Sequence, residues 1–297
     1  MNQARKNICF INNFNNEKFI EACLGSVLQQ STPFDQVLVI DDGSTDRSLE
    51  IIQHYVQHHS HLHLISKKNE GQFSTFNTAA AALPDNAQIF LLDGDDIYPH
   101  DYLEASLSAI GVDQWDFAFC EQQKFTESSD IPHSAILNQE SAFFFDSTSG
   151  LVRSRECWIG SPTSCISLSS ELFKKIFPYP YYQEKAFWAD NLMIYVSSIL
   201  GARKIYLPGL GVGWRAHQNN DSRKIYSQDD VARREKAISQ AFSWFCQKYG
   251  ISRYPSVSEF FQEYDALGKY WQKRLDLPSR YKMLNRLLRQ QIKNIFA

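Results

Sequence analysis

The feature that most constrains the fold is a regular alternation of strand and helix signals over the first 120 residues. Short apolar runs lie at residues 8–11, 37–40, 62–65 and 89–92. Between them, apolar side chains recur every three or four positions, as along residues 19–28, which is the spacing of one helix face. Strands that alternate with helices of this length predict an α/β fold, in which a mostly parallel central sheet is flanked by helices.

Polar clusters follow three of the predicted strands. NNFNN comes after the first strand, DDGSTD after the second and DGDD after the fourth. In open α/β sheets, ligands bind outside the carboxyl ends of the strands. We therefore expect the three clusters to line a single crevice.

The DGDD cluster places Asp93, Asp95 and Asp96 so close together that they repel one another unless a cation lies among them. Gly94 allows the backbone to turn there. Carboxylates suit a hard cation such as Mg²⁺ or Mn²⁺, which completes its shell with water and phosphate oxygens. The alternative is an Asp-rich turn with a helix cap before Pro99.

In DDGSTD, Ser44 or Thr45 can cap the helix that follows. Capping does not explain Asp42, whose carboxylate would face the crevice. A carboxylate in that place can accept the N–H of a pyrimidine ring, a contact that distinguishes uracil from cytosine.

The run ICFINNFNNEKFIEACLGSVLQQSTPFDQVLVIDDGSTD, followed by NEGQFSTFNTA and LLDGDD, resembles the family 2 glycosyltransferases, which have the GT-A fold. The resemblance covers residues 7–105. It implies a Rossmann-like, mostly parallel sheet and the transfer of a sugar from a nucleotide-diphosphate sugar, usually a UDP-sugar, to an acceptor hydroxyl.

The resemblance also implies which residues bind the nucleotide sugar. Asn12 stands in place of the family's Pro and Phe14 in place of its Tyr, both beside the uracil. Asp42 is the expected uracil contact. Gln72 belongs to the segment that closes over the donor.

For the D-x-D-D motif, the resemblance makes Asp93 the outer member, places Asp95 near the ribose and the metal, and makes Asp96 a metal ligand. VGWRAHQNNDS resembles the family's Y-R-x-H-x-x-N-S segment. It implies that His217 is a third protein ligand to the metal and that Arg215 faces the diphosphate, where a guanidinium suits phosphate geometry. A structural histidine is the alternative for His217.

Asp190, in FWADNLM, falls where the family has its catalytic base, although Ala189 replaces the Glu that normally precedes it. The alternative for Asp190 is a helix N-cap. Trp158 and Trp188 are expected to form the wall that binds the acceptor sugar, with core packing as the alternative.

These assignments together imply a single displacement at the anomeric carbon with inversion of its configuration. Asp190 would act as general base. Mn²⁺ or Mg²⁺ would neutralise the leaving diphosphate as a Lewis acid. The family places such enzymes in cell-surface polysaccharide or glycolipid synthesis, with a saccharide or a lipid-linked saccharide as acceptor.

We expect a GT-A catalytic domain over residues 1–220, with nucleotide-sugar binding in 1–120 and the acceptor side in 121–220, and a helical C-terminal extension over 221–297. Three helices are expected in the extension, at 231–249, 259–275 and 280–296. Eight Lys and Arg against one Asp lie between residues 268 and 297. The last helix is basic and amphipathic, which is typical of peripheral membrane contact through 280–297. Packing on the catalytic domain or on a second subunit of a homo-oligomer is the alternative.

Composition excludes some partners and compartments. The net charge of −3 gives no reason to expect nucleic acid as a partner. No apolar run reaches the roughly 18 residues of a membrane span, and the first ten residues lack a signal-peptide pattern. The six cysteines have no CxxC spacing and read as reduced thiols. We therefore expect the cytoplasm, or the cytoplasmic face of the membrane.

Two other functions fit part of the pattern. A catalytically inactive nucleotide-sugar-binding or scaffold protein would keep Asp42, and Ala189 is the feature that favours it. A nucleotidyltransferase also uses paired aspartates on a βα sheet. It normally has a Gly-rich, basic loop after the first strand, which NNFNN lacks.

Overall fold

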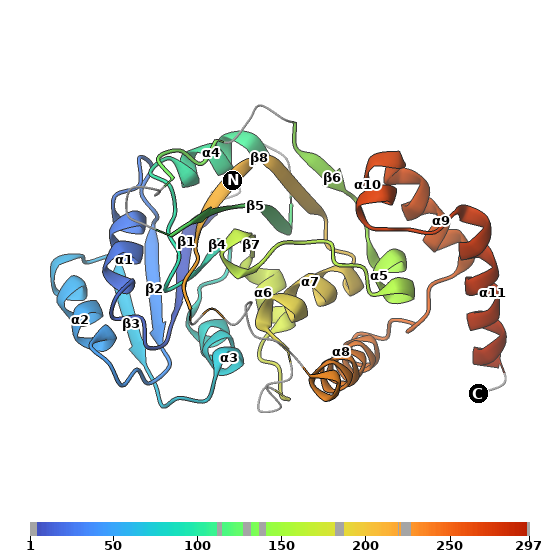
Figure 1. The fold of residues 1–297 in the computed structure, drawn as a ribbon, viewed down its shortest axis with the longest axis horizontal. Helices are drawn as coiled ribbons and strands as arrows, with labels where there is room; N and C mark the ends of the chain where they lie inside the picture. Colours follow the sequence, from blue (N-terminus) through green and yellow to red (C-terminus); the bar gives the residue numbers. More distant parts are fainter. Residues whose placement is uncertain are drawn as a thin grey trace.

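The computed structural model describes residues 5–111, 115–126, 132–136, 141–181, 187–218, 220 and 227–295, with side chains up to residue 289. In this part of the chain, one eight-stranded sheet runs in the order β3-β2-β1-β4-β7-β5-β8-β6, with helices on both faces (Figure 1). The strands are β1 (Lys6–Asn13), β2 (Gln36–Asp41), β3 (Leu62–Ser66), β4 (Ala87–Asp93), β5 (Phe117–Phe125), β6 (Phe143–Phe145), β7 (Ile166–Ser169) and β8 (Lys204–Arg215). The predicted α/β class is confirmed.

The helices before residue 220 are α1 (Ile20–Leu28), α2 (Ser48–His58), α3 (Gln72–Ala82), α4 (Tyr102–Ile110), α5 (Ser149–Arg155), α6 (Ser170–Ile176) and α7 (Ala189–Ile199). The helices after it are α8 (Gln228–Lys248), α9 (Val257–Ala266), α10 (Gly268–Arg274) and α11 (Arg280–Ile295). Over the described residues, none of them combines the length and the hydropathy that a membrane crossing requires.

Alternate residues of the strands enter two separate cores. In β1, Ile8 and Phe10 join the cluster under α3, α6, α7 and the C-terminal helices, whereas Cys9 and Ile11 join the cluster under α1, α2 and α4. This alternation follows from the two-residue period of a strand. Because both faces are covered, the interiors of β1, β2 and β4 are largely apolar and most of their polar residues fall at the ends.

The strand register brings the three polar clusters together. β1 lies between β2 and β4 and is parallel to both. Asn13 pairs with Asp41 of β2, and Asn12 pairs with Asp93 of β4. The carboxyl ends of these three strands therefore form one polar edge, as predicted.

β8 delivers the second half of the chain to the same edge. Its register against β5 shifts after residue 207, and residue 211 then pairs with Glu121. Beyond this bulge, Gly213 exchanges two backbone hydrogen bonds of 3.0 Å with Ile97, just after the DGDD cluster. A Cβ at position 213 would lie 2.7 Å from Cγ1 of Ile97, so only glycine permits this approach.

The expectation of one helix over 259–275 was wrong. The chain forms α9 and α10 instead, and Gly268, the first residue of α10, has a φ of +64°. A residue in the left-handed region ends a helix, and glycine adopts that region at little cost.

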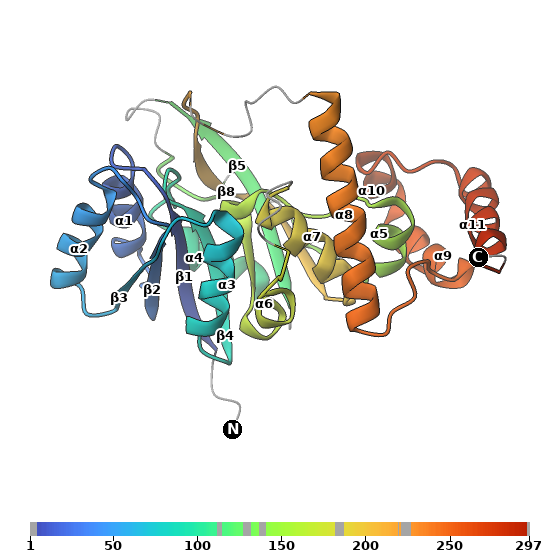
Figure 2. The same cartoon turned by 90° about the horizontal axis from the view of Figure 1, so that it is seen from below.

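The apolar face of α11 packs on the protein over its described side chains. Met283 and Leu287 are buried and belong to the same core cluster as β1 and α7. Leu288 remains 43% exposed. Figure 1 and Figure 2, seen from two directions, both show α9, α10 and α11 together at the end of the molecule opposite β3 and α2.

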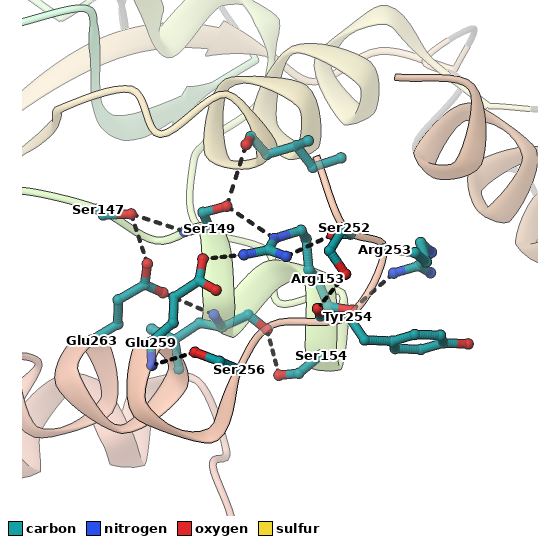
Figure 3. A network of polar contacts seen from close by, with 12 residues as sticks. Ser147, Ser149, Arg153, Ser154, Ser252, Arg253, Tyr254, Ser256, Glu259 and Glu263 are labelled. Carbon is teal, nitrogen blue, oxygen red and sulfur yellow. Dashed lines mark hydrogen bonds and ion pairs between the residues drawn. The ribbon is translucent and has the colours of Figure 1, made fainter. Parts of the chain in front are cut away.

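A polar network fastens α9 to α5 (Figure 3). Arg153, only 4% exposed, donates from Nε to Oγ of Ser149 at 3.1 Å, from Nη1 to the carbonyl of Ser252 at 2.6 Å, and from Nη2 to Glu259. Glu263 accepts from Oγ of Ser147 at 2.6 Å and, with its other oxygen, from the backbone N–H of residue 151 at 2.9 Å. The helices after residue 220 therefore share both a core and a buried polar network with the sheet domain.

Candidate active site

A cavity of about 1020 Å³ opens at the polar edge of the sheet. Its lining includes these residues predicted from the sequence: Asn12, Phe14, Asp42, Gln72, Asp93, Asp95, Asp96, Trp158, Trp188, Asp190 and His217. They come from four strand ends, from α3, from the start of α7 and, for Trp158, from the segment after α5. Arg215 is the one predicted site residue that is not in the lining.

Asp42 lines the cavity and holds the segment after β3 in place. Its Oδ1 accepts from Nζ of Lys67 at 2.5 Å and from the backbone N–H of Glu70 at 3.1 Å. Its Oδ2 accepts from the backbone N–H of Gly71 at 2.8 Å. Gly71, with a φ of 92°, directly precedes α3 and so positions Gln72 at the cavity. Sequence reasoning missed Lys67, because nothing distinguishes it from the adjacent surface residue Lys68.

Phe14 and Asn12 lie next to Asp42 on the same side of the cavity. The Phe14 ring is 43% exposed, which leaves an apolar face open to a ligand. Nδ2 of Asn12 donates to Oδ1 of Asp93 at 3.2 Å. A proline at position 12 could not make this bond, so Asn12 adds a polar link between β1 and β4.

The side-chain carboxyl groups of Asp93 and Asp96 have raised pKa values. Burial and the charge of Asp95 raise the pKa of Asp93 to about 7. Burial, Asp95 and Asp93 likewise raise the pKa of Asp96 well above its ordinary value. Asp96 accepts from Oγ of Ser164 at 2.6 Å and from the backbone N–H of Arg215 at 3.0 Å. Ser164, which sequence reasoning did not assign to this cluster, also accepts from the backbone N–H of Asp93.

Asp95 forms a second polar group with residues that follow β8. Its Oδ2 lies 2.8 Å from Nε2 of His217 and 3.4 Å from Nδ2 of Asn220. Oδ1 of Asn220 accepts from the backbone N–H of His217 at 2.7 Å. The His217 ring also packs on Phe19, with ring centroids 4.7 Å apart, and this contact fixes its plane.

The chemistry of this donor set fits a hard divalent cation. Among the described residues, no three His, Cys, Asp or Glu side chains converge as a complete metal site. Mg²⁺ and Mn²⁺ need only one or two carboxylates when water and phosphate oxygens complete the shell. Burial and, after it, the neighbouring aspartates raise the pKa values of Asp93 and Asp96, and a bound cation would offset both effects.

Arg215 lies beside the acidic cluster but is not in the lining of the cavity. Its guanidinium lies between the rings of Phe19 and Phe125, 4.9 and 4.5 Å from their centroids. Its Nε donates to the backbone carbonyl of Asp95 at 3.0 Å. In this arrangement Arg215 supports the DGDD turn, and its contact with a diphosphate stays a prediction.

Asp190 lies in the first turn of α7 and lines the cavity. Burial raises its pKa to about 6, although the backbone N–H of Asn191 donates to its Oδ1 at 2.6 Å and Arg234 lowers the pKa. A carboxylate with this pKa suits a general base near neutral pH. The backbone N–H of Ala189 donates to Oε1 of Gln72 at 3.1 Å, so α3 and α7 are joined directly at the cavity.

The wall around Asp190 is aromatic, with one cation. Trp158, 37% exposed, packs edge-on against Tyr195. The Arg234 guanidinium of α8 lies 4.7 Å from the ring centroid of Trp188. Sequence reasoning missed Arg234, because it stands in a charged stretch of an amphipathic helix and belongs to no motif. Its only signal was its position on the helix that follows the VGWRAHQNNDS segment.

The profile of the family described as "Glycosyl transferase family 2" matches residues 8–177. An uncharacterized glycosyltransferase of Nostoc sp. is 26% identical over 232 residues, which are 78% of this chain and 70% of that protein. For two further curated relatives, the segment that matches this chain spans only 15% and 31% of the relative's own length.

Solved structures show the same fold. Staphylococcus aureus TarS 1-349 in complex with UDP-GlcNAc has a TM-score of 0.61 at 20% identity, covering 90% of this chain and 81% of that chain. A mannosyltransferase from Pyrobaculum calidifontis in complex with GDP-Man and Mn²⁺ has a TM-score of 0.54 at 14% identity, covering 99% and 88%.

Proposed function

Because the chain belongs to glycosyl transferase family 2, we propose that it is a metal-dependent, inverting hexosyltransferase that moves a sugar from a UDP-sugar to an acceptor hydroxyl. The observation that carries the proposal is the single cavity. Its lining brings together Asp42 and Phe14, the acidic cluster, and the half-buried carboxylate of Asp190.

In this reaction Asp190 takes the proton of the acceptor hydroxyl while the hydroxyl oxygen attacks the anomeric carbon. The bond between that carbon and the diphosphate oxygen breaks, and UDP leaves with the bonding electron pair. Attack on the face opposite the leaving group inverts the configuration. A bound Mn²⁺ or Mg²⁺, held by Asp95, Asp96 and His217, would supply Lewis-acid neutralisation of the diphosphate.

The nucleotide is bound by residues of the first half of the chain. Phe14 offers its exposed ring face to the uracil, and Asp42 accepts from the ring N–H. Asn12 and Asp93 are hydrogen-bonded to each other where the ribose would lie. Trp158 and Trp188 form the wall that the acceptor sugar packs against. We also propose that nucleotide-sugar binding is confined to residues 1–120, and that the catalytic domain ends at residue 220.

Release of UDP from UDP-sugars in the presence of Mn²⁺ tests the function. Asp190→Asn should reduce transfer by at least about 10²-fold and leave UDP binding unchanged. Asp146→Asn, at a side chain that is 96% exposed, is the matched control. A near-native rate in Asp190→Asn would contradict the base assignment. Release of pyrophosphate would indicate a nucleotidyltransferase, and UDP binding without turnover would indicate a scaffold protein.

The cellular location that we propose depends on the expected acceptor, which is a saccharide or a lipid-linked saccharide. We assign the enzyme to cell-surface polysaccharide or glycolipid synthesis on the cytoplasmic face of the membrane. Lys282 and Arg289 on the exposed side of α11 would contact anionic lipid, since the apolar residues Met283 and Leu287 are buried. Flotation with vesicles that contain phosphatidylglycerol should fail for Lys282→Glu/Arg289→Glu. A homo-oligomer stays a prediction, which light scattering checks.

A further inference from the structure

The cavity contains a cation to which the proposed mechanism assigns no contact with a substrate. Arg234, on α8, lines the cavity and stacks on Trp188. One of its five N–H groups, on Nη2, donates to Oδ1 of Asn191 at 3.2 Å. In the described part of the chain, no carboxylate pairs with Arg234, whereas its neighbour Arg233 pairs with Asp230.

A buried donor beside Arg234 also lacks a partner. Asn191 lines the cavity with no exposed surface, and its Nδ2 has no hydrogen-bond partner among the described residues. Its Oδ1 already accepts from Arg234 and from the backbone N–H of Trp188 at 3.3 Å. An unmade hydrogen bond of a buried donor is costly, so a ligand atom that accepts from Nδ2 would be bound favourably.

The charges of the cavity favour a particular position for an anion. Five aspartates line it, and among the described lining residues Arg234 is the sole Lys or Arg. Arg234 lies close enough to Asp190 to lower its pKa. The guanidinium lies over Trp188 and donates to Asn191, and these two residues flank Asp190 at the start of α7, so Arg234 is placed beside Asp190.

We propose that Arg234 and Asn191 form a subsite for an oxyanion on the acceptor, a carboxylate or a phosphate close to the attacking hydroxyl. This inference rests on the proposed function, because it takes Asp190 to mark the acceptor end. The Trp188 ring holds the guanidinium plane, so its remaining N–H groups are preorganised for two parallel bonds to an oxyanion. Nδ2 of Asn191 supplies a further donor. Neutral acceptors would leave these donors unpaired.

A matched series of probes tests the subsite. Phenyl β-glucoside, phenyl β-glucuronide and phenyl β-glucoside 6-phosphate differ only at C6, and the galactosides form a parallel series. Binding to the full chain with UDP and Mn²⁺ is measured by calorimetry, which needs no turnover. We expect at least one anionic probe in one series to bind about tenfold or more tightly than its neutral counterpart. The glucuronide and the phosphate distinguish the two sources of the oxyanion.

Two arginine variants on the same helix separate the subsite from general charge effects. Arg234→Gln should abolish the preference for the anionic probe, and Arg234→Lys should restore part of it. Arg233→Gln, at an exposed side chain, should keep the preference in full. A role of Arg234 in packing alone would weaken the binding of neutral and anionic probes equally.

Several results would overturn the subsite. They are equal binding of neutral and anionic probes, binding of none of the six, and a preference that survives Arg234→Gln. A loss of UDP affinity in Arg234→Gln without any acceptor would assign the guanidinium to the donor diphosphate instead. Failure of the proposed reaction is distinguished by UDP release. An anionic preference without UDP release would leave the subsite standing and refute the transferase.

Discussion

Nε2 of His217 lies 2.8 Å from Oδ2 of Asp95, although the two residues are 122 positions apart in the sequence. His217 follows β8 and Asp95 follows β4. The pair joins the acidic cluster to the segment that follows β8. The bulge in β8 and the close contact between Gly213 and Ile97 bring that segment to this edge of the sheet.

This pair predicts that His217 contributes to cation affinity. His217→Ala should weaken Mn²⁺ binding by at least about tenfold, because it removes a nitrogen donor and frees the Asp95 carboxylate to reorient. Calorimetric titration of Mn²⁺ in the presence of UDP measures the change. His63→Ala, at an exposed position of β3, is the matched control. If His217→Ala binds Mn²⁺ with native affinity, His217 is a structural residue.

The pH profile of transfer should have an acid limb with a midpoint near the Asp190 pKa of about 6. Transfer requires the deprotonated base, so kcat/KM rises as the pH rises through this value. Arg234 stabilises the carboxylate form, so Arg234→Gln should raise this pKa and move the limb to higher pH. Arg233→Gln should leave the limb in place. An identical midpoint in Arg234→Gln and wild type would show that the guanidinium does not act on Asp190.

Glu263 is expected to contribute to the stability of the α5–α9 contact. Glu263→Gln keeps the shape of the side chain but turns one acceptor into a donor that faces Oγ of Ser147 or the backbone N–H of residue 151. Loss of one hydrogen bond there should lower the free energy of unfolding by about 1–3 kcal/mol. Urea denaturation measures the change. Glu235→Gln, on an exposed side of α8, should have no comparable effect.

Lys204 makes the stability of the protein depend on pH in the alkaline range. Its Nζ is buried, donates to the carbonyls of Ile159 and Ile194 at 2.8 and 2.9 Å, and has a pKa well below its usual value because of burial. Between the folded-state pKa and the ordinary value of about 10.4, the unfolded chain binds more protons than the folded one. Stability should therefore rise with pH through this window.

Lys204→Met removes this titration and serves as the comparison. The difference in unfolding free energy between wild type and Lys204→Met should shift in favour of wild type as the pH rises from about 7 to about 10. Denaturation at several pH values measures it. A difference that does not change with pH would mean that the Lys204 amine titrates equally in both states.

Local sequence patterns were sufficient to predict most of the fold of residues 1–120, the segment predicted to bind the nucleotide sugar. The apolar runs predicted β1 to β4, and the parallel arrangement predicted that Asn12, Asp42 and the DGDD cluster would share an edge. Both predictions depend on interactions between residues close in sequence and on the geometry of one repeated unit. They did not extend to Glu259–Leu275, where a single glycine conformation interrupts the helix.

The sequence alone determined the alternation of strands and helices, the edge at which the carboxylates gather, and the family resemblance of Asp190. Only the tertiary structure decided that Lys67 neutralises Asp42, that Ser164 binds Asp96, that Arg215 stacks between two phenylalanines, and that Arg234 reaches the cavity. Each of these contacts joins segments distant in the sequence or selects one charged side chain among several equivalent ones. The physical reason is that period and polarity specify which face of an element is buried, whereas the partner of a polar side chain depends on how the elements pack.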